Sequence, residues 1–205
     1  MLCLKVATDA AWVVQAMRAP DAVLVDHAHC EIKAAANALS LAARYPDDAE
    51  TTRTLAALAA EEIDHFQKVH ALLSSRGVPM GRPPVDPYAA ELRRAATRLP
   101  PNGGGLVDRL LVGALIEARS CERFQLLADA TRESAAYAAV HDLWTELFAS
   151  EARHYRTFVD LAVRAAGGDR SRTTDRLEAL SLEEGIIVSA LARGGKAAAR
   201  AAIHG

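Results

Sequence analysis

Cysteine and aromatic residues are scarce in this chain of 205 residues. The three cysteines, Cys3, Cys30 and Cys121, stand alone and form no Cys-x-x-Cys pair. This spacing argues against a disulfide framework, a structural zinc knot and a rubredoxin-type iron site, and it favours a reducing cytoplasm. Aromatic residues make up only 5% of the chain, and alanine and leucine supply most of its apolar content. Because these two residues favour helices over strands, the composition predicts an all-α protein.

Long apolar runs and a strong net charge are also missing. No uninterrupted apolar run approaches the roughly 20 residues that a membrane-spanning helix needs. The opening residues lack the basic stretch and cleavage site of a secretory signal, so we expect no association with a membrane. The formal net charge of −2 argues against a protein that coats nucleic acid, but it leaves room for a local basic patch.

Proline and glycine divide the sequence into long helical segments. Pro20 suits a first helical turn, Pro46 and Asp47 a tight turn, and Gly77 a helix end. The pattern predicts core helices at about 20–45, 49–76, 106–130 and 134–166, with short additional helices at the N-terminus (9–18), in the crossover (88–98) and at the C-terminus (after 169). Short, long and short connections between the core helices give the connectivity of a ferritin-like four-helix bundle. We therefore expect a single ferritin-like domain over residues 1–205.

Two Glu-x-x-His units indicate a metal site. Glu62 and His65 lie on the second core helix, and Glu151 and His154 lie on the fourth. Residues three apart share one face of a helix, so each unit offers a carboxylate and an imidazole to one point. A single such unit is weak evidence, but each of these stands in the second helix of a predicted hairpin.

A glutamate lies opposite each unit. In an antiparallel hairpin, residues at one level are equidistant from the turn. The midpoint between Glu31 and Glu62 falls at the Pro46-Asp47 turn, and that between Glu117 and Glu151 falls at Ser134. Four carboxylates and two imidazoles at one level are the ligand set of di-iron carboxylate proteins, and this donor set suits iron or manganese. The predicted metal ligands are Glu31, Glu62, His65, Glu117, Glu151 and His154.

Glu122 is the alternative ligand on the third core helix. Its midpoint with Glu151 falls among residues 136–137, where nothing in the sequence breaks a helix, so Glu117 is preferred. Residues that would support the ligands from behind are less clearly marked. His27 precedes Glu31 by one turn and is either an extra ligand, a proton carrier or a plain polar neighbour. The other candidates for a supporting role are Glu61, Arg119, Glu122 and Ser150.

Four segments resemble the MiaE-type tRNA hydroxylases. They are His27-Ala28-His29-Cys30-Glu31, Glu61-Glu62-Ile63-Asp64-His65-Phe66, residues 113–124 (GALIEARSCERF), and Ser150-Glu151-Ala152-Arg153-His154-Tyr155. The third segment is the most specific, because di-iron proteins in general require only its glutamate. The resemblance covers roughly residues 10–165. Ser150 departs from the wider di-iron pattern, in which many relatives have an aspartate before Glu-x-x-His.

The resemblance implies a non-haem di-iron monooxygenase. Its cofactors would be two iron ions held by the six predicted ligands, with O2 as co-substrate. Its substrate would be the isopentenyl group of 2-methylthio-isopentenyladenosine next to the anticodon of tRNA. An external ferredoxin or reductase would supply electrons, and the protein would be a cytoplasmic monomer or small oligomer.

Basic residues mark candidate contacts with RNA phosphates. The main candidates are Arg93, Arg94, Arg98, Arg193, Lys196 and Arg200, and a second group comprises Arg164, Arg170, Arg172 and Arg176. Three other functions fit the same sequence: a ferritin-like iron-binding protein or ferroxidase, a di-iron oxygenase acting on a small molecule, and a metal-free helical bundle.

Overall fold

The computed structural model describes residues 2–83, 87–100 and 105–193. These residues form seven α-helices and one short 3-10 helix, and they contain no strand, so the all-α class expected from the composition is confirmed. The helices belong to two compact units: one contains α2 and α3, and the other contains α1 and α4 to α7. The single domain over residues 1–205 stays a prediction.

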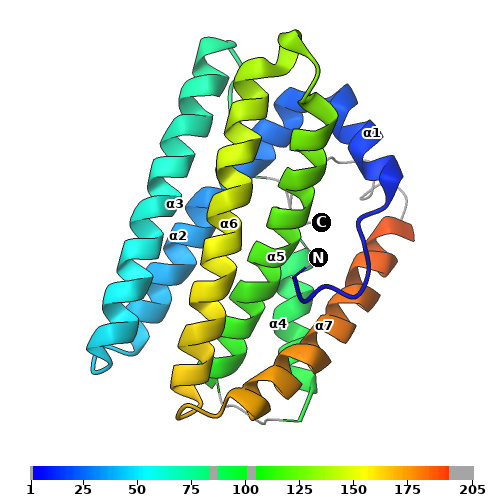
Figure 1. The fold of residues 1–205 in the computed structure, drawn as a ribbon. Helices are drawn as coiled ribbons and strands as arrows, with labels where there is room; N and C mark the ends of the chain where they lie inside the picture. Colours follow the sequence, from blue (N-terminus) through cyan, green and yellow to red (C-terminus); the bar gives the residue numbers. More distant parts are fainter. Residues whose placement is uncertain (1, 84–86, 101–104, 194–205) are drawn as a thin grey trace. The chain divides into compact units, whose positions relative to one another are not determined.

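The helices α2 (Pro20–Arg44) and α3 (Ala49–Ser75) form a hairpin, drawn in blue and cyan in Figure 1. Pro20 occupies the first turn of α2, where a missing N–H costs nothing. Asp48 caps α3 by accepting hydrogen bonds from the backbone N–H of Thr51 (3.1 Å) and from its hydroxyl (2.8 Å). After α3, Gly77 adopts a φ of 66°, a conformation that favours glycine and ends the helix. The sequence signals at both ends of this hairpin therefore act as predicted.

The helices α5 (Gly105–Thr131) and α6 (Ala138–Ala165) form the hairpin of the other unit. A 3-10 turn, η1 (Ala135–Tyr137), precedes α6, so the regular helix begins four residues later than the sequence predicted. The connection is closed by His141 of α6, whose Nδ1 atom lies 3.0 Å from the Ala128 carbonyl and 3.2 Å from the Thr131 hydroxyl. These side-chain bonds hold the end of α5 against the start of α6.

Three further helices belong to the same unit as α5 and α6. They are α1 (Ala10–Arg18), α4 (Tyr88–Arg98) and α7 (Arg170–Arg193). α4 packs on α7, both contact α5, and α1 contacts α5 as well. α7 has 24 residues and is longer than the short C-terminal helix expected from the sequence. Within this unit α5 contacts four other helices, which explains why its buried residues are spread around its whole circumference.

Buried leucine and alanine side chains form most of the apolar core, among them Leu24, Ala28 and Leu55 in one unit and Leu110, Leu115 and Leu147 in the other. Within the described residues, every helix is too short or too polar to cross a membrane.

Candidate metal centre

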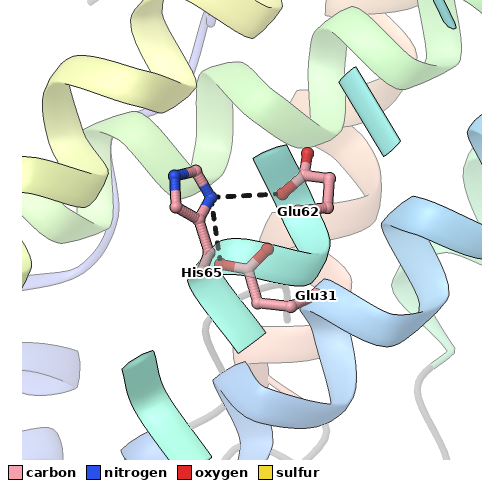
Figure 2. A group of neighbouring side chains, drawn as sticks. All are labelled: Glu31, Glu62 and His65. Carbon is pink, nitrogen blue, oxygen red and sulfur yellow. Dashed lines mark ion pairs between the residues drawn. The ribbon is translucent and has the colours of Figure 1, made fainter. Parts of the chain in front are cut away.

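The hairpin of α2 and α3 brings three predicted ligands together. Glu31 projects from α2 toward Glu62 and His65, which lie one turn apart on α3 (Figure 2). The Nδ1 atom of His65 lies 3.4 Å from Oε2 of Glu62 and 3.8 Å from Oε1 of Glu31. All three residues are buried, with exposed fractions of 2%, 1% and 4% for Glu31, Glu62 and His65. The register inferred from the Pro46-Asp47 turn is therefore the register of the hairpin.

The donor set of this cluster fits a metal ion. One ligand atom from each residue can be chosen so that all three lie within 4.8 Å of one another. That spread is close to the span of two metal–ligand bonds of about 2.1 Å each. Two carboxylates and one imidazole suit iron or manganese rather than a soft metal.

The pKa shifts inside the cluster are also consistent with a metal ion. Burial raises the pKa of Glu31 well above its usual value, and a hydrogen bond with Glu62 raises it further. Burial lowers the pKa of His65, but hydrogen bonds with Glu31 and Glu62 outweigh this effect and raise the pKa to about 10. Both shifts arise because two carboxylates are forced together away from water, where each needs a positive partner. A divalent cation would supply that charge to both carboxylates at once.

The hairpin of α5 and α6 buries the other three predicted ligands, Glu117, Glu151 and His154, with exposed fractions of 5%, 3% and 3%. The contacts on either side of Glu117 define the register. Four residues before it, a Cβ atom at Gly113 would lie 3.0 Å from the Phe158 ring. Four residues after it, the Cys121 thiol donates to the Phe148 carbonyl (3.7 Å). Residues 151–154 lie between Phe148 and Phe158, so Glu117 faces the level of Glu151 and His154.

Glu117 is less closely placed than the other ligands of its hairpin. The ligand atoms of Glu151 and His154 lie within 4.8 Å of each other, but the Glu117 carboxylate is not within that distance of both.

The glycine at position 113 has a packing explanation. The Phe158 ring occupies the space beside it, so this glycine permits a close approach of α5 and α6.

Comparison with known proteins identifies the family. The family model described as tRNA-(ms2io6A)-hydroxylase (MiaE) matches residues 1–196. The chain belongs to this family. Two tRNA 2-(methylsulfanyl)-N(6)-isopentenyladenosine(37) hydroxylases are similar to it. That of Pseudomonas putida is 40% identical over 155 residues, covering 76% of this chain and 72% of the relative. That of Salmonella typhimurium is 29% identical over 214 residues, covering 80% and 76%.

A solved structure supports the fold class. A Synechococcus protein described as having aldehyde deformylating oxygenase activity superposes with a TM-score of 0.85, at 36% identity. The match covers 100% of this chain and 96% of that protein. It confirms the ferritin-like class expected for a member of the MiaE family.

Arg119 and Glu122, two of the supporting candidates, belong to a buried polar network. Glu122 accepts hydrogen bonds from the Thr8 backbone N–H (3.1 Å) and hydroxyl (2.6 Å), and it pairs with Arg119. Arg119 also donates to Glu184 of α7 from Nε (3.0 Å) and Nη2 (2.8 Å), and the Tyr88 hydroxyl donates to the same carboxylate (2.9 Å). Glu122 is thus held by the N-terminal segment and Arg119, whereas Glu117 lies on the face of α5 that contacts α6.

Two partners in this network, Tyr88 and Glu184, were not found from the sequence. Tyr88 and Glu184 lie 31 residues before and 65 residues after Arg119, and neither belongs to a motif. The only local signal for Glu184 is an acidic residue followed directly by the apolar run Gly185-Ile186-Ile187-Val188. This pattern does not predict which residue Glu184 pairs with.

The remaining supporting candidates differ in position. His27 is buried, and its Nε2 atom lies 2.6 Å from Oε1 of Glu31. The Ser150 hydroxyl lies 3.4 Å from Nε2 of His154 on its own helix and accepts a hydrogen bond from Arg153 (3.1 Å). Glu61, by contrast, is exposed. Ser150 thus contacts the histidine four residues further along its own helix.

The candidate RNA-binding arginines are mostly exposed. Arg93, Arg94 and Arg98 lie on the outer face of α4, where Arg94 pairs with Glu91 and Arg98 lies 3.6 Å from Glu183. Arg193 is exposed at the end of α7, and Lys196 and Arg200 lie outside the described residues.

The prediction that Arg176, in the second group of basic residues, contacts RNA is wrong. It is buried, its Nε donates to Asp108 (2.8 Å), and its Nη atoms donate to the carbonyls of Ala96 (2.9 Å) and Pro100 (2.8 Å). It therefore joins α7 to α4 and α5 and is not a surface contact for RNA.

Proposed function

We propose that this member of the MiaE family hydroxylates the isopentenyl group of 2-methylthio-isopentenyladenosine next to the anticodon of tRNA, with a non-haem di-iron centre. The supporting observations are the family match over residues 1–196 and the 40% identity to the hydroxylase of Pseudomonas putida. The buried cluster of Glu31, Glu62 and His65 is the observation that carries the metal part of the proposal.

The proposed ligands are the six predicted from the sequence. Glu31, Glu62 and His65 would come from one hairpin, and Glu117, Glu151 and His154 from the other. When bound, two iron ions would supply the activation of O2 that the hydroxylation requires. One oxygen atom enters a C–H bond of the isopentenyl group and the other leaves as water, with two electrons and two protons consumed. The residues of this chain hold the metal and keep water away from it, which is why all six are buried.

Electrons would come from outside the chain. A ferredoxin or reductase is the expected donor, and we expect a monomer or small oligomer in the cytoplasm. The exposed arginines of α4, Arg93, Arg94 and Arg98, are the proposed contacts for tRNA phosphates. An adenosine in an anticodon loop is unstacked more easily than a base in a duplex, so a local basic surface is sufficient.

The test is mass analysis of tRNA nucleosides. Cells lacking the protein should contain the unhydroxylated isopentenyl nucleoside, and the intact gene should restore the hydroxylated one. A gene with Glu62→Ala should restore nothing, and its protein should lose bound iron. Glu61→Ala changes the exposed neighbour of Glu62 and should behave as the wild type. Unchanged hydroxylation in the deletion strain would remove the tRNA assignment and leave the metal assignment to be judged by iron content.

An aldehyde substrate is the second candidate. The superposition on a protein with aldehyde deformylating oxygenase activity over 100% of this chain favours it. Purified iron-loaded protein supplied with O2 and a reductant would then release formate from an aldehyde. Formate release together with unchanged tRNA would replace the first proposal with the second.

A further inference from the structure

The N-terminal segment, residues 4–8, is not helical and binds the side of α5 that faces away from α6 (Figure 1). The Thr8 backbone N–H (3.1 Å) and hydroxyl (2.6 Å) both donate to the Glu122 carboxylate. Arg119, three residues earlier on α5, donates to the Thr8 hydroxyl (3.0 Å) and to the Val6 carbonyl (2.9 Å). Successive turns of α5 are therefore bonded to the same short segment.

The same segment is fixed on α7. Lys5 pairs with Glu178 of α7 (2.6 Å), and Leu4 is buried. A Cβ atom at Gly185 of α7 would lie 2.8 Å from Cγ2 of Val6, closer than real Cβ atoms come to their neighbours. A glycine is therefore needed there for Val6 to lie against the backbone of α7. Because the segment is held by α7, its hydrogen bonds to α5 resist a rotation of α5 about its own axis.

A rotation of α5 would move Glu117. This residue is two positions before Arg119, so the two side chains point about 200° apart on one rigid helix. An α-helix with its side chains has a radius of about 5–6 Å, so a rotation of about 10° moves an atom at that radius by about 1 Å. The groups of a functional site must be held within about 0.5 Å of their working positions. Glu117 is also the predicted ligand that lies least close to its hairpin partners.

We propose that the N-terminal segment is a positioning element of the metal centre, which through Thr8 fixes the rotation of α5 and so holds Glu117 at the level of Glu151 and His154. The proposal rests on the proposed function in one respect, because it requires Glu117 to be a metal ligand. It goes further in assigning a part in metal binding to a segment that lies outside the core helices. Thr8 is a positioning residue in this proposal, since it acts through Arg119 and Glu122.

The experiment is a titration of metal-free protein with Co2+, followed by its visible absorption, with the bound metal counted by elemental analysis. Thr8→Val removes the hydroxyl and keeps the shape of the side chain. It should weaken the binding of one ion by about 10–100-fold, the range found when a residue that orients a metal ligand is removed. The ion held by Glu31, Glu62 and His65 should bind as in the wild type. Thr8→Ser restores the hydroxyl and should bind both ions as the wild type does.

Further variants separate positioning from stability. Gly185→Ala displaces Val6 from the opposite side of the segment, and it should weaken the same ion as Thr8→Val. Lys5→Ala removes only the exposed ion pair of the segment and should bind both ions as the wild type does. Asp48→Ala removes the cap of α3, which lowers stability without altering the segment, and it should also bind both ions normally. Circular dichroism of each variant establishes that it is folded.

Two results would overturn the proposal. Wild-type binding of both ions by folded Thr8→Val or Gly185→Ala would show that the segment positions nothing. Equal weakening of both ions, or the same weakening in Asp48→Ala, would reduce the effect to a general loss of stability. Failure of the wild-type protein to bind any metal is a different result, because it rejects the metal centre itself and the role of the segment with it.

Discussion

The buried ion pair between Arg119 and Glu184 should be one of the most sensitive points in the fold. Both side chains are 0% exposed, and the Glu184 carboxylate accepts hydrogen bonds from two nitrogens of Arg119 and from the Tyr88 hydroxyl. Glu184→Ala would leave the guanidinium and the hydroxyl in place without that carboxylate. Breaking a buried pair from one side costs about 3–5 kcal/mol. Since a whole domain is stable by only about 5–15 kcal/mol, we expect Glu184→Ala to remove a large part of the stability.

Urea denaturation followed by circular dichroism measures this loss. With a slope of about 1–3 kcal/mol per molar urea, the midpoint should fall by about 2 M. Glu178→Ala is the control on the same helix, because Glu178 forms an exposed pair with Lys5 (2.6 Å) that should contribute less than about 1 kcal/mol. The triple variant Arg119→Met/Glu122→Gln/Glu184→Leu removes Arg119 together with both carboxylates that pair with it, and it should recover part of the lost stability. Equal midpoints for Glu184→Ala and Glu178→Ala would refute the reasoning.

Three further effects follow from the geometry. Gly113→Ala should lower the melting temperature, because its Cβ would lie 3.0 Å from the buried Phe158 ring. Overpacking costs about 1–3 kcal/mol, against a gain of about 1 kcal/mol in helix propensity. A higher melting temperature would contradict this. Asp48→Ala removes the cap of α3 and should lower the free energy of unfolding, measured by urea denaturation, by about 1 kcal/mol. Asp48→Asn should keep most of the stability, because asparagine also caps helices. Burial raises the pKa of Cys121 from 9.0 to about 11, so this thiol should resist alkylation at pH 8 in the folded protein and react once urea unfolds it. The same shift stabilises the folded state fully below pH 9, and that contribution should be lost as the pH rises toward about 11.

Much of the hairpin geometry could be predicted because its causes are local. The Pro46-Asp47 turn sets the register of α2 on α3, and the register places Glu31 opposite the unit of Glu62 and His65. The same reasoning placed Glu117 at the level of residues 151–154, although a 3-10 turn precedes α6 and was not anticipated. A helix hairpin has few degrees of freedom. The position of the turn and the helical period of 3.6 residues are therefore almost sufficient to predict which residues of the two helices face each other.

Long-range polar contacts could not be predicted in this way. Arg176 was grouped with surface arginines because composition and spacing do not reveal whether a charge has a buried partner, and Asp108 lies 68 residues away. The same limit applies to Glu184 and Tyr88. Such pairs depend on how α4 and α7 pack on α5, and the sequence patterns of those helices specify only that each has an apolar face.

These contacts also explain why residues 113–124 carry the most specific family resemblance. Successive residues of a helix are about 100° apart, so Arg119 points about 200° away from Glu117 and Glu122 about 140° away. The face with Gly113, Glu117 and Cys121 packs on α6, as the contacts with Phe158 and Phe148 show. The face with Arg119 and Glu122 binds the N-terminal segment and α7. A metal site in a helical bundle requires only the first of these faces. The second face is required only in a protein whose N-terminal segment, α4 and α7 are attached to α5 through one buried arginine. This additional requirement distinguishes residues 113–124 from a general di-iron motif.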